Sequence, residues 1–167
     1  MRRTPTLIGA SLVAAATVFA IMVSAGSAQA PGERTLTFVE RTVPGADVFA
    51  DVPPLSKTVL GKGDGFLFRN DVLDAAGTTK LGIHEGRCSL LRGRPGGIGN
   101  RLICDGVYTL KDGTFTGTTA FTFTKKPKIG FTVAGGTGAY EGARGSGTLA
   151  YRSLTNPLAD TTIHLLP

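Results

Sequence analysis

Residues 131–151, FTVAGGTGAYEGARGSGTLAY, decide the fold, because this glycine-rich stretch has apolar residues on both sides. A phosphate-binding P-loop needs a Lys after its last glycine, and none follows here. A dinucleotide fingerprint needs G-x-G-x-x-G opening a helix. Gly142 comes one residue late after Gly136 and Gly138, and residues 147–151 alternate as a strand does. The segment is therefore not a nucleotide-binding loop.

The alternative is a tight turn that joins two strands. We expect Gly135, Gly136 and Gly138 to take turn conformations, and Gly142 and Gly145 to allow close backbone packing. For Tyr140 and Arg144, which lie in the same segment, we expect packing and turn roles.

Outward from this turn, apolar and polar residues alternate with period two, punctuated by Gly, Pro and Asp, and helix signals are nearly absent after residue 31. The alternation predicts eight strands, at 36–42, 66–72, 80–91, 101–110, 114–124, 129–134, 145–152 and 161–165. Residues 44–54 read as a loop with a short strand around Val48. Eight short, regularly spaced strands indicate an antiparallel sandwich or barrel.

The clearest hairpin lies in residues 105–124, DGVYTLKDGTFTGTTAFTFT. Asp112-Gly113 predicts a two-residue turn that sets Leu110 opposite Phe115. Gly106 and Gly117, on the inner face, leave room for a bend or a cavity. The face expected inside carries Cys104, Tyr108, Leu110, Phe115, Phe121 and Phe123. The face expected to meet solvent or another subunit carries Thr114, Thr116, Thr118, Thr122 and Thr124.

The two cysteines, Cys88 and Cys104, flank the turn-rich segment GRPGGIGN. If the strands on either side pair as a hairpin, the cysteines lie directly opposite each other, where a disulfide is possible. The alternative is a buried free thiol. A metal site is not expected, because only His84 and His164 are available beside the cysteines.

The first thirty residues read as a secretory signal peptide, with a basic head, an apolar run at 7–23 and the small residues SAGSAQA. We expect cleavage after Ala28 rather than Ala30, because Pro31 follows the second site. An uncleaved membrane anchor is the alternative. Export would place the protein in an oxidising, extracellular compartment, which favours the disulfide.

Residues 31–167 are expected to form one domain without a membrane span. The net charge of +6 is mild. The clusters Arg92, Arg94, Arg101 and Lys125, Lys126, Lys128 are interpreted as solvated loops, since nucleic-acid binding needs a denser basic stripe or aromatic platforms.

Two segments resemble one family of β-barrels. GGTGAYEGARGSGTL resembles the glycine-rich strand–turn–strand of the allene oxide cyclase and dirigent family. Residues 62–91, KGDGFLFRNDVLDAAGTTKLGIHEGRCSLL, resemble a second cyclase segment. The resemblance covers residues 35–167. It implies an eight-stranded antiparallel barrel with a central pocket, often trimeric, that works without a cofactor.

The resemblance also assigns candidate residues. Asn70 and Cys88 match two functional positions of the cyclases by motif. Alignment of the first strand, LTFVER, puts Thr37 and Val39 where the cyclases have a Glu and an Asn, so we predict that this strand supplies no acid. Asp51 with Pro53 resembles the acidic residue and Pro of the dirigent pattern.

Other candidates come from the alternation. Asn70, Tyr108, Phe115 and Phe121 are expected to line a ligand pocket. His84 shares a face with Cys88, where an imidazole is suited to act as a general base. Glu40, Arg41 and Asp51 are candidates for the barrel mouth, and a solvated surface position is the alternative. Asn70, His84, Glu40 and Asp51 are the candidate catalytic residues.

Two functions follow. The first is a secreted barrel that binds a small apolar molecule without changing it. The second is a cofactor-independent isomerase, cyclase or coupling guide that uses the same pocket. An interior lined only by apolar groups would favour binding, whereas an acid or His paired with Asn70 inside would favour chemistry.

Overall fold

The structure is a computed structural model that describes residues 32–50, 61–94, 97–153 and 155–166. The signal peptide, its cleavage sites, Asp51 and Pro53 lie outside the described residues. The strands are β1 (Arg34–Thr42), β2 (Val48–Ala50), β3 (Gly65–Leu73), β4 (Lys80–Arg92), β5 (Arg101–Leu110), β6 (Gly113–Thr122), β7 (Lys128–Gly138), β8 (Arg144–Tyr151) and β9 (Leu158–Leu166). Within these ranges no helix is long and apolar enough to cross a membrane.

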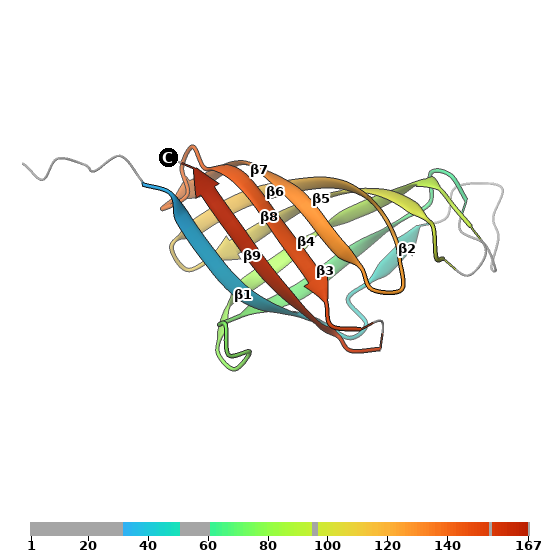
Figure 1. The fold of residues 1–167 in the computed structure, drawn as a ribbon, viewed down its shortest axis with the longest axis horizontal. Helices are drawn as coiled ribbons and strands as arrows, with labels where there is room; N and C mark the ends of the chain where they lie inside the picture. Colours follow the sequence, from blue (N-terminus) through green and yellow to red (C-terminus); the bar gives the residue numbers. More distant parts are fainter. Residues whose placement is uncertain (1–31, 51–60, 95–96, 154, 167) are drawn as a thin grey trace, which may run out of the picture.

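Eight of the strands close into an antiparallel β-barrel (Figure 1). Strands β3 to β9 pair in chain order, and β1 closes the ring by pairing with both β9 and β3. Strand β2 is additional and lies along the first residues of β3. The predicted all-β fold of eight strands is confirmed, and the barrel replaces the sandwich alternative.

The glycine-rich segment forms the β7–β8 connection, as expected, but the turn is shorter than predicted. Gly135, Gly136 and Gly138 belong to β7, and only residues 139–143 connect the strands. Gly142 lies in the left-handed region at φ 70° with no atom near its missing side chain, so it serves the turn and not close packing. At Gly145, a side chain would collide with the carbonyl oxygen of His164, so close packing there is confirmed.

The β5–β6 hairpin differs from its predicted register by two residues. The turn consists of Lys111 and Asp112, and Leu110 pairs with Gly113 instead of Phe115. Gly113 belongs to β6 because it also pairs with β7, where a side chain would collide with the carbonyl oxygen of Thr137. A slip of two keeps every side chain on its predicted face. The apolar face therefore points inward as expected, and Thr116, Thr118 and Thr122 are exposed.

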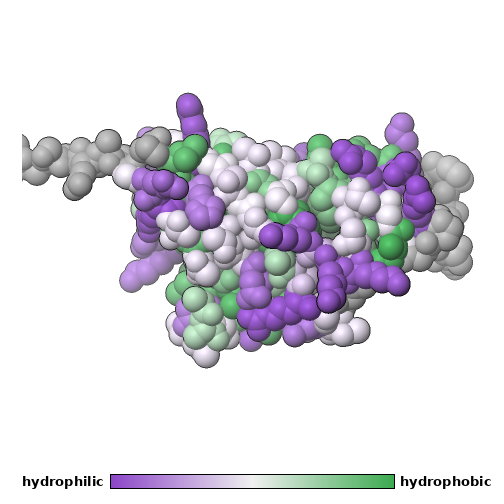
Figure 2. Space-filling model, viewed as in Figure 1, coloured by the Kyte–Doolittle hydropathy of each residue, from purple (hydrophilic) through white to green (hydrophobic). Residues whose placement is uncertain are grey.

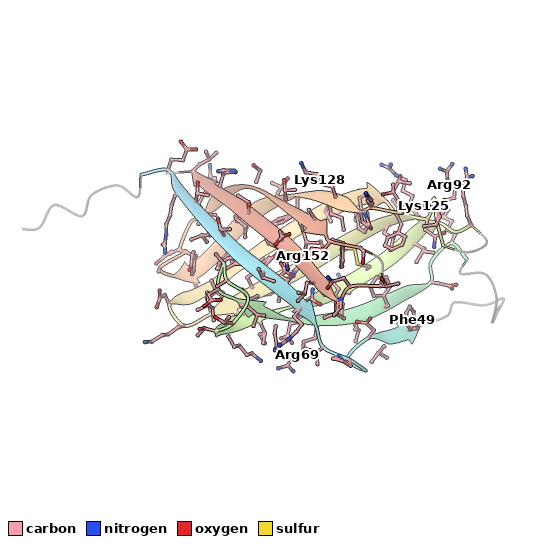
Figure 3. All side chains as sticks on the ribbon, turned by 60° about the horizontal axis from the view of Figure 1, so that its bottom comes forward. Phe49, Arg69, Arg92, Lys125, Lys128 and Arg152 are labelled. Carbon is pink, nitrogen blue, oxygen red and sulfur yellow. A yellow bond between two sulfur atoms is a disulfide. The ribbon has the colours of Figure 1, made fainter. Side chains whose placement is uncertain are left out.

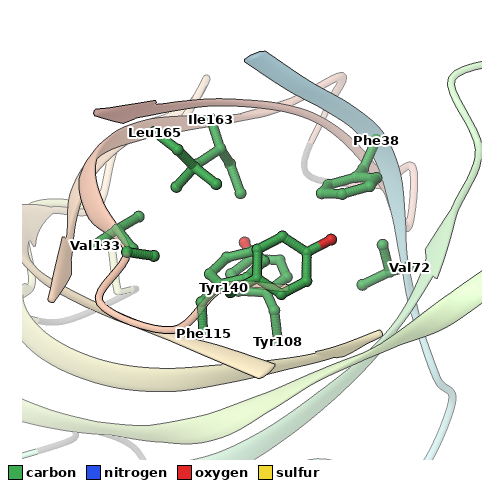
Figure 4. Close-up of a cluster of buried hydrophobic side chains, with 9 residues drawn as sticks. Phe38, Val72, Tyr108, Phe115, Val133, Tyr140, Ile163 and Leu165 are labelled. Carbon is green, nitrogen blue, oxygen red and sulfur yellow. The ribbon is translucent and has the colours of Figure 1, made fainter. Parts of the chain in front are cut away.

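One end of the barrel is filled by packed side chains (Figure 4). Tyr140, from the glycine-rich turn, packs edge-on against Phe115 with ring centroids 5.1 Å apart, and Arg34 lies 5.4 Å from the Tyr140 ring centroid. The side chains around them are Phe38, Val72, Tyr108, Val133, Ala143, Ile163 and Leu165. The turn thus closes this end, which confirms the packing role expected for Tyr140.

Cys88 on β4 pairs directly with Cys104 on β5, and the two form a disulfide. This confirms the pairing expected for strands that flank the turn-rich segment GRPGGIGN. Because the cysteines are separated by 16 positions in sequence, the bond removes much of the freedom of the unfolded chain.

We predict that Cys88→Ala/Cys104→Ala lowers the free energy of unfolding by about 3 kcal/mol, measured by urea titration. Thiol titration of the unfolded, unreduced wild type checks the bond itself. Two reactive thiols per chain, or a double variant as stable as the wild type, would contradict the prediction.

Candidate functional site

The other half of the barrel holds a cavity of about 330 Å³. It is lined by residues near the β1–β2, β4–β5, β6–β7 and β8–β9 connections, so this end is the mouth. Its walls are mostly aromatic and aliphatic: Phe66, Phe68, Leu90, Leu102, Phe121, Phe123, Ile129, Phe131, Leu149 and Tyr151, with the disulfide between β4 and β5. An apolar cavity with a few polar groups is typical of a small-molecule site.

Three polar side chains form one row across three strands at the inner end of the cavity. Asn70 on β3 pairs with His84 on β4, and His84 pairs with Tyr108 on β5. All three line the cavity. The rings of His84 and Tyr108 stack with centroids 3.9 Å apart, and Phe68 meets His84 edge-on at 5.0 Å. The row is a direct product of register, because paired residues of adjacent strands point to the same face.

The side chain of Glu40 on β1 contacts all three members of this row and is 1% exposed. Its Oε2 accepts hydrogen bonds from Asn70 Nδ2 at 3.0 Å and from His84 Nδ1 at 2.8 Å. Its Oε1 accepts from the Tyr108 hydroxyl at 2.7 Å and from Thr161 Oγ1, on β9, at 2.8 Å. Both carboxylate oxygens are thus fully engaged, which compensates for the loss of water around a buried charge.

These contacts keep Glu40 ionised. Burial alone would raise its pKa, but the charge of His84 and the hydrogen bonds from His84, Tyr108 and Asn70 outweigh burial, and the pKa lies below its ordinary value of 4.5. The same carboxylate acts in the opposite direction on the phenols. Burial, and then the charge of Glu40, raise the pKa of Tyr108 well above 10 and that of Tyr151 to about 12.

An ionised carboxylate only accepts hydrogen bonds, so the proton between Glu40 and His84 belongs to His84 Nδ1. When the ring is neutral, its free lone pair is on Nε2. Nε2 lies so close to Gly106 of β5 that any side chain at position 106 would collide with it. Gly106 therefore leaves the room that the imidazole occupies at the cavity wall, as the sequence suggested. Gly117 similarly faces the ring of Phe131.

The structure corrects the prediction that the first strand supplies no acid. Thr37 is exposed, and Val39 is buried on the outer side, where Gly77 of the β3–β4 connection contacts it. Glu40 shares the inner face with Leu36 and Phe38, so the alternation of β1 contained the signal. The alignment of LTFVER with the cyclases pointed to Thr37 and Val39 instead, and so missed Glu40.

Glu40 is therefore not at a solvated mouth. Arg41 is on the surface as expected and contacts Asp71 at 3.0 Å. Phe115 lies in the packed end beneath Tyr108 and is not among the residues lining the cavity, because a two-residue shift in register moves it toward the closed end. Asn70, Tyr108 and Phe121 do line the cavity.

Thr161 was not identified from the sequence. Its alternation with Ala159 and Ile163 places it inside, but a lone inward Thr carries no further signal. Among the described residues, no three His, Cys, Asp or Glu side chains are grouped to hold a metal ion.

No protein-family model matches the sequence, and no curated protein sequence is similar to it. Solved structures are similar in fold. A pyocyanin demethylase matches at TM-score 0.64 and 17% identity, covering 79% of this chain and 99% of that chain. A pterocarpan synthase dirigent protein matches at TM-score 0.58 and 18% identity, covering 80% and 89%. An exo-specific intermolecular Diels-Alderase matches at TM-score 0.58 and 15% identity, covering 80% and 99%. The chain thus has the barrel fold of dirigent proteins and cyclase-like barrels, as the glycine-rich segment implied.

We predict that Glu40→Gln lowers the free energy of unfolding by about 3 kcal/mol near neutral pH, because the amide nitrogen of Gln would face donors instead of accepting from them. The exposed Glu85→Gln on β4 is the matched control and should change stability by less than about 0.5 kcal/mol. Equal stability of the two variants would contradict the role given to Glu40.

The pH dependence of this difference follows from the lowered pKa of Glu40. The stabilisation is fully present above pH 4.5, the ordinary value, and is lost as the pH falls through the lower folded-state pKa. Urea titrations between neutral pH and about pH 3 should therefore show the wild type approaching Glu40→Gln in acid. A gap between the two proteins that widens in acid would refute the assignment.

Proposed function

We propose that the protein binds one small, largely apolar molecule in the barrel cavity and moves a proton on it, as an isomerase or cyclase does. The observation that carries the proposal is the 2.8 Å hydrogen bond from His84 Nδ1 to the buried Glu40 carboxylate, at the inner end of an apolar cavity. His84 is the proposed catalytic base, and Glu40 is the residue that positions it.

In the proposed step, His84 Nε2 takes a proton from a C–H or O–H bond of the bound molecule. The electron pair of that bond moves into the molecule's unsaturated system, and the positive charge on the imidazole is stabilised by Glu40. If the same proton returns to a second position of the molecule, a double bond is shifted, which is an isomerisation. If the new anion instead attacks an electrophilic carbon of the same molecule, a ring closes, and the proton returns to the atom that receives the displaced electron pair. Neither outcome requires an oxidant or a reductant.

The neighbouring groups support this division of roles. Tyr108 donates its hydroxyl proton to Glu40, so it holds the carboxylate in place. Asn70 uses one of its two amide protons on Glu40 and has a second for a ligand oxygen on which negative charge develops. The apolar walls exclude water, which strengthens these polar contacts.

The comparisons support the same class of function. The solved structures that share the fold are named for a demethylase, a dirigent-type synthase and a Diels-Alderase. In other proteins, this barrel therefore hosts small-molecule chemistry in addition to binding.

The test uses 5-nitrobenzisoxazole, a flat apolar probe whose ring opens when a base removes its C–H proton. Nitrogen–oxygen bond cleavage then releases a coloured nitrophenolate. We predict that the protein accelerates this reaction about 100-fold or more over free imidazole, because a positioned base contributes on that order. His84→Gln should remove most of the acceleration.

The chain offers a matched control, because it has two histidines. His164 is exposed on β9 and contacts Thr35 at 3.1 Å, so His164→Gln should retain full activity. If His84→Gln also retains it, the base lies elsewhere. If the probe binds without reacting in the wild type, the barrel is a binding protein, the first of the two functions expected from the sequence.

Export is also proposed from the sequence and is supported by the Cys88–Cys104 disulfide, since such bonds persist in oxidising compartments. The intact mass of protein collected from the culture medium should correspond to a chain that begins after Ala28. A full-length mass, retained with the cells, would contradict export. The same measurement under native conditions reports whether the barrel forms the homo-oligomer that its Thr-rich face suggests.

A further inference from the structure

Two of the connections at the mouth of the barrel are hydrogen-bonded to each other. Gly99, in the β4–β5 connection, donates its backbone N–H to the carbonyl of Phe123 at 2.8 Å, and Phe123 N–H donates to Asn100 at 2.8 Å. Gly97, Asn100 and Phe123 all line the cavity. These two segments, through their described residues 92–94, 97–101 and 123–128, are therefore one edge of the opening, which we call the rim.

The rim is strongly cationic. It carries six basic residues and no acidic one: Arg92, Arg94, Arg101, Lys125, Lys126 and Lys128. All six are exposed. The ion pairs found among the described residues join other cations, so the rim charges are not neutralised there. Figure 3 shows Arg92 and Lys125 at the same end of the barrel, and Figure 2 shows hydrophilic residues at that end as well as elsewhere on this face.

The closed end has no such excess. At each of its three connections, or on the first residue of the strand that follows, one basic and one acidic residue occur: Asp74 with Lys80, Lys111 with Asp112, and Glu141 with Arg144. The excess of positive charge is thus greater at the rim than at the closed end. A cleft bordered by one sign of charge attracts ligands of the opposite sign.

The inner end of the cavity has the opposite charge. Glu40 is a buried carboxylate there, so a permanent anion placed beside it would be disfavoured by like-charge repulsion, whereas the charge that develops on a ligand in the proposed step is balanced by the imidazolium of His84. One acid, the exposed Asp47, lines the cavity from the β1–β2 connection. An anionic group would consequently be repelled from the interior and from the β1–β2 side, and attracted to the rim.

From this polarity we propose that the ligand is an amphipathic anion, whose apolar body fills the cavity while a carboxylate, sulfonate or phosphate stays at the rim formed by residues 92–94, 97–101 and 123–128. The inference rests on the proposed function and deepens it. It also fixes the direction of binding, with the reactive part of the ligand toward His84 and the anionic end toward solvent.

The experiment compares two fluorescent probes with the same ring system. 8-Anilinonaphthalene-1-sulfonate carries a sulfonate, and N-phenyl-1-naphthylamine is its neutral counterpart. We expect the sulfonate to bind roughly ten-fold more tightly at low salt, since a few exposed charge contacts together contribute about this much. The preference should vanish near 1 M salt, where charges are screened beyond about 3 Å.

Charge variants locate the preference. Arg94→Gln/Lys125→Gln should reduce it to about two-fold while leaving the neutral probe unchanged. Lys111→Gln/Arg144→Gln, at the closed end, removes the same net charge and should retain the full preference. Thr119→Phe, which fills the cavity, should abolish binding of both probes, with circular dichroism to verify that the variant folds.

The outcomes separate the two proposals. If both probes bind the wild type equally, or if the closed-end variant loses the preference as the rim variant does, the anionic ligand is refuted and the cavity as a binding site stands. A preference that survives in folded Thr119→Phe would place the sulfonate outside the cavity and also refute the inference. If neither probe binds the wild type, the proposed function fails, and this inference fails with it.

Discussion

The structure depends on one buried carboxylate. Glu40 accepts hydrogen bonds from Asn70, His84, Tyr108 and Thr161, which lie on four different strands. It sits on β1, the strand that closes the barrel by pairing with both β3 and β9. An unpaired charge at this depth would cost several kcal/mol, so the four partners together stabilise the closed barrel. The same constraint orients the imidazole at the cavity wall.

This arrangement divides the interior into two parts. Below the polar row, Tyr108 stacks on Phe115 at 4.6 Å and Tyr140 closes the end, so the space is filled. Above it, the glycines at 106 and 117 and the disulfide-linked wall leave an apolar cavity open toward the mouth. Packing therefore explains why, within the described residues, the cavity lies toward one end of the barrel.

The sequence predicted the parts of this structure that depend on local pattern. Alternation located eight strands, and the turn-rich segment GRPGGIGN predicted that Cys88 pairs with Cys104. Both features depend on residues that are close in the chain. The site depends on contacts between distant strands. Glu40 and Thr161 are 121 residues apart, and nothing in either segment signals that the other will face it. Glu40 was misplaced for a related reason, since a charged residue is expected outside unless its partners are known.

The central claim is that Glu40 fixes the imidazole of His84 with its proton on Nδ1 and its lone pair on Nε2. The most direct measurement is a long-range nitrogen–proton correlation spectrum of the two histidines, recorded over a range of pH so that the neutral ring can be recognised from its nitrogen shifts. His164→Gln assigns the signals. The account predicts a single Nδ1–H tautomer for His84 that is lost in Glu40→Gln. An Nε2–H tautomer, or a mixture that does not respond to Glu40→Gln, would contradict it.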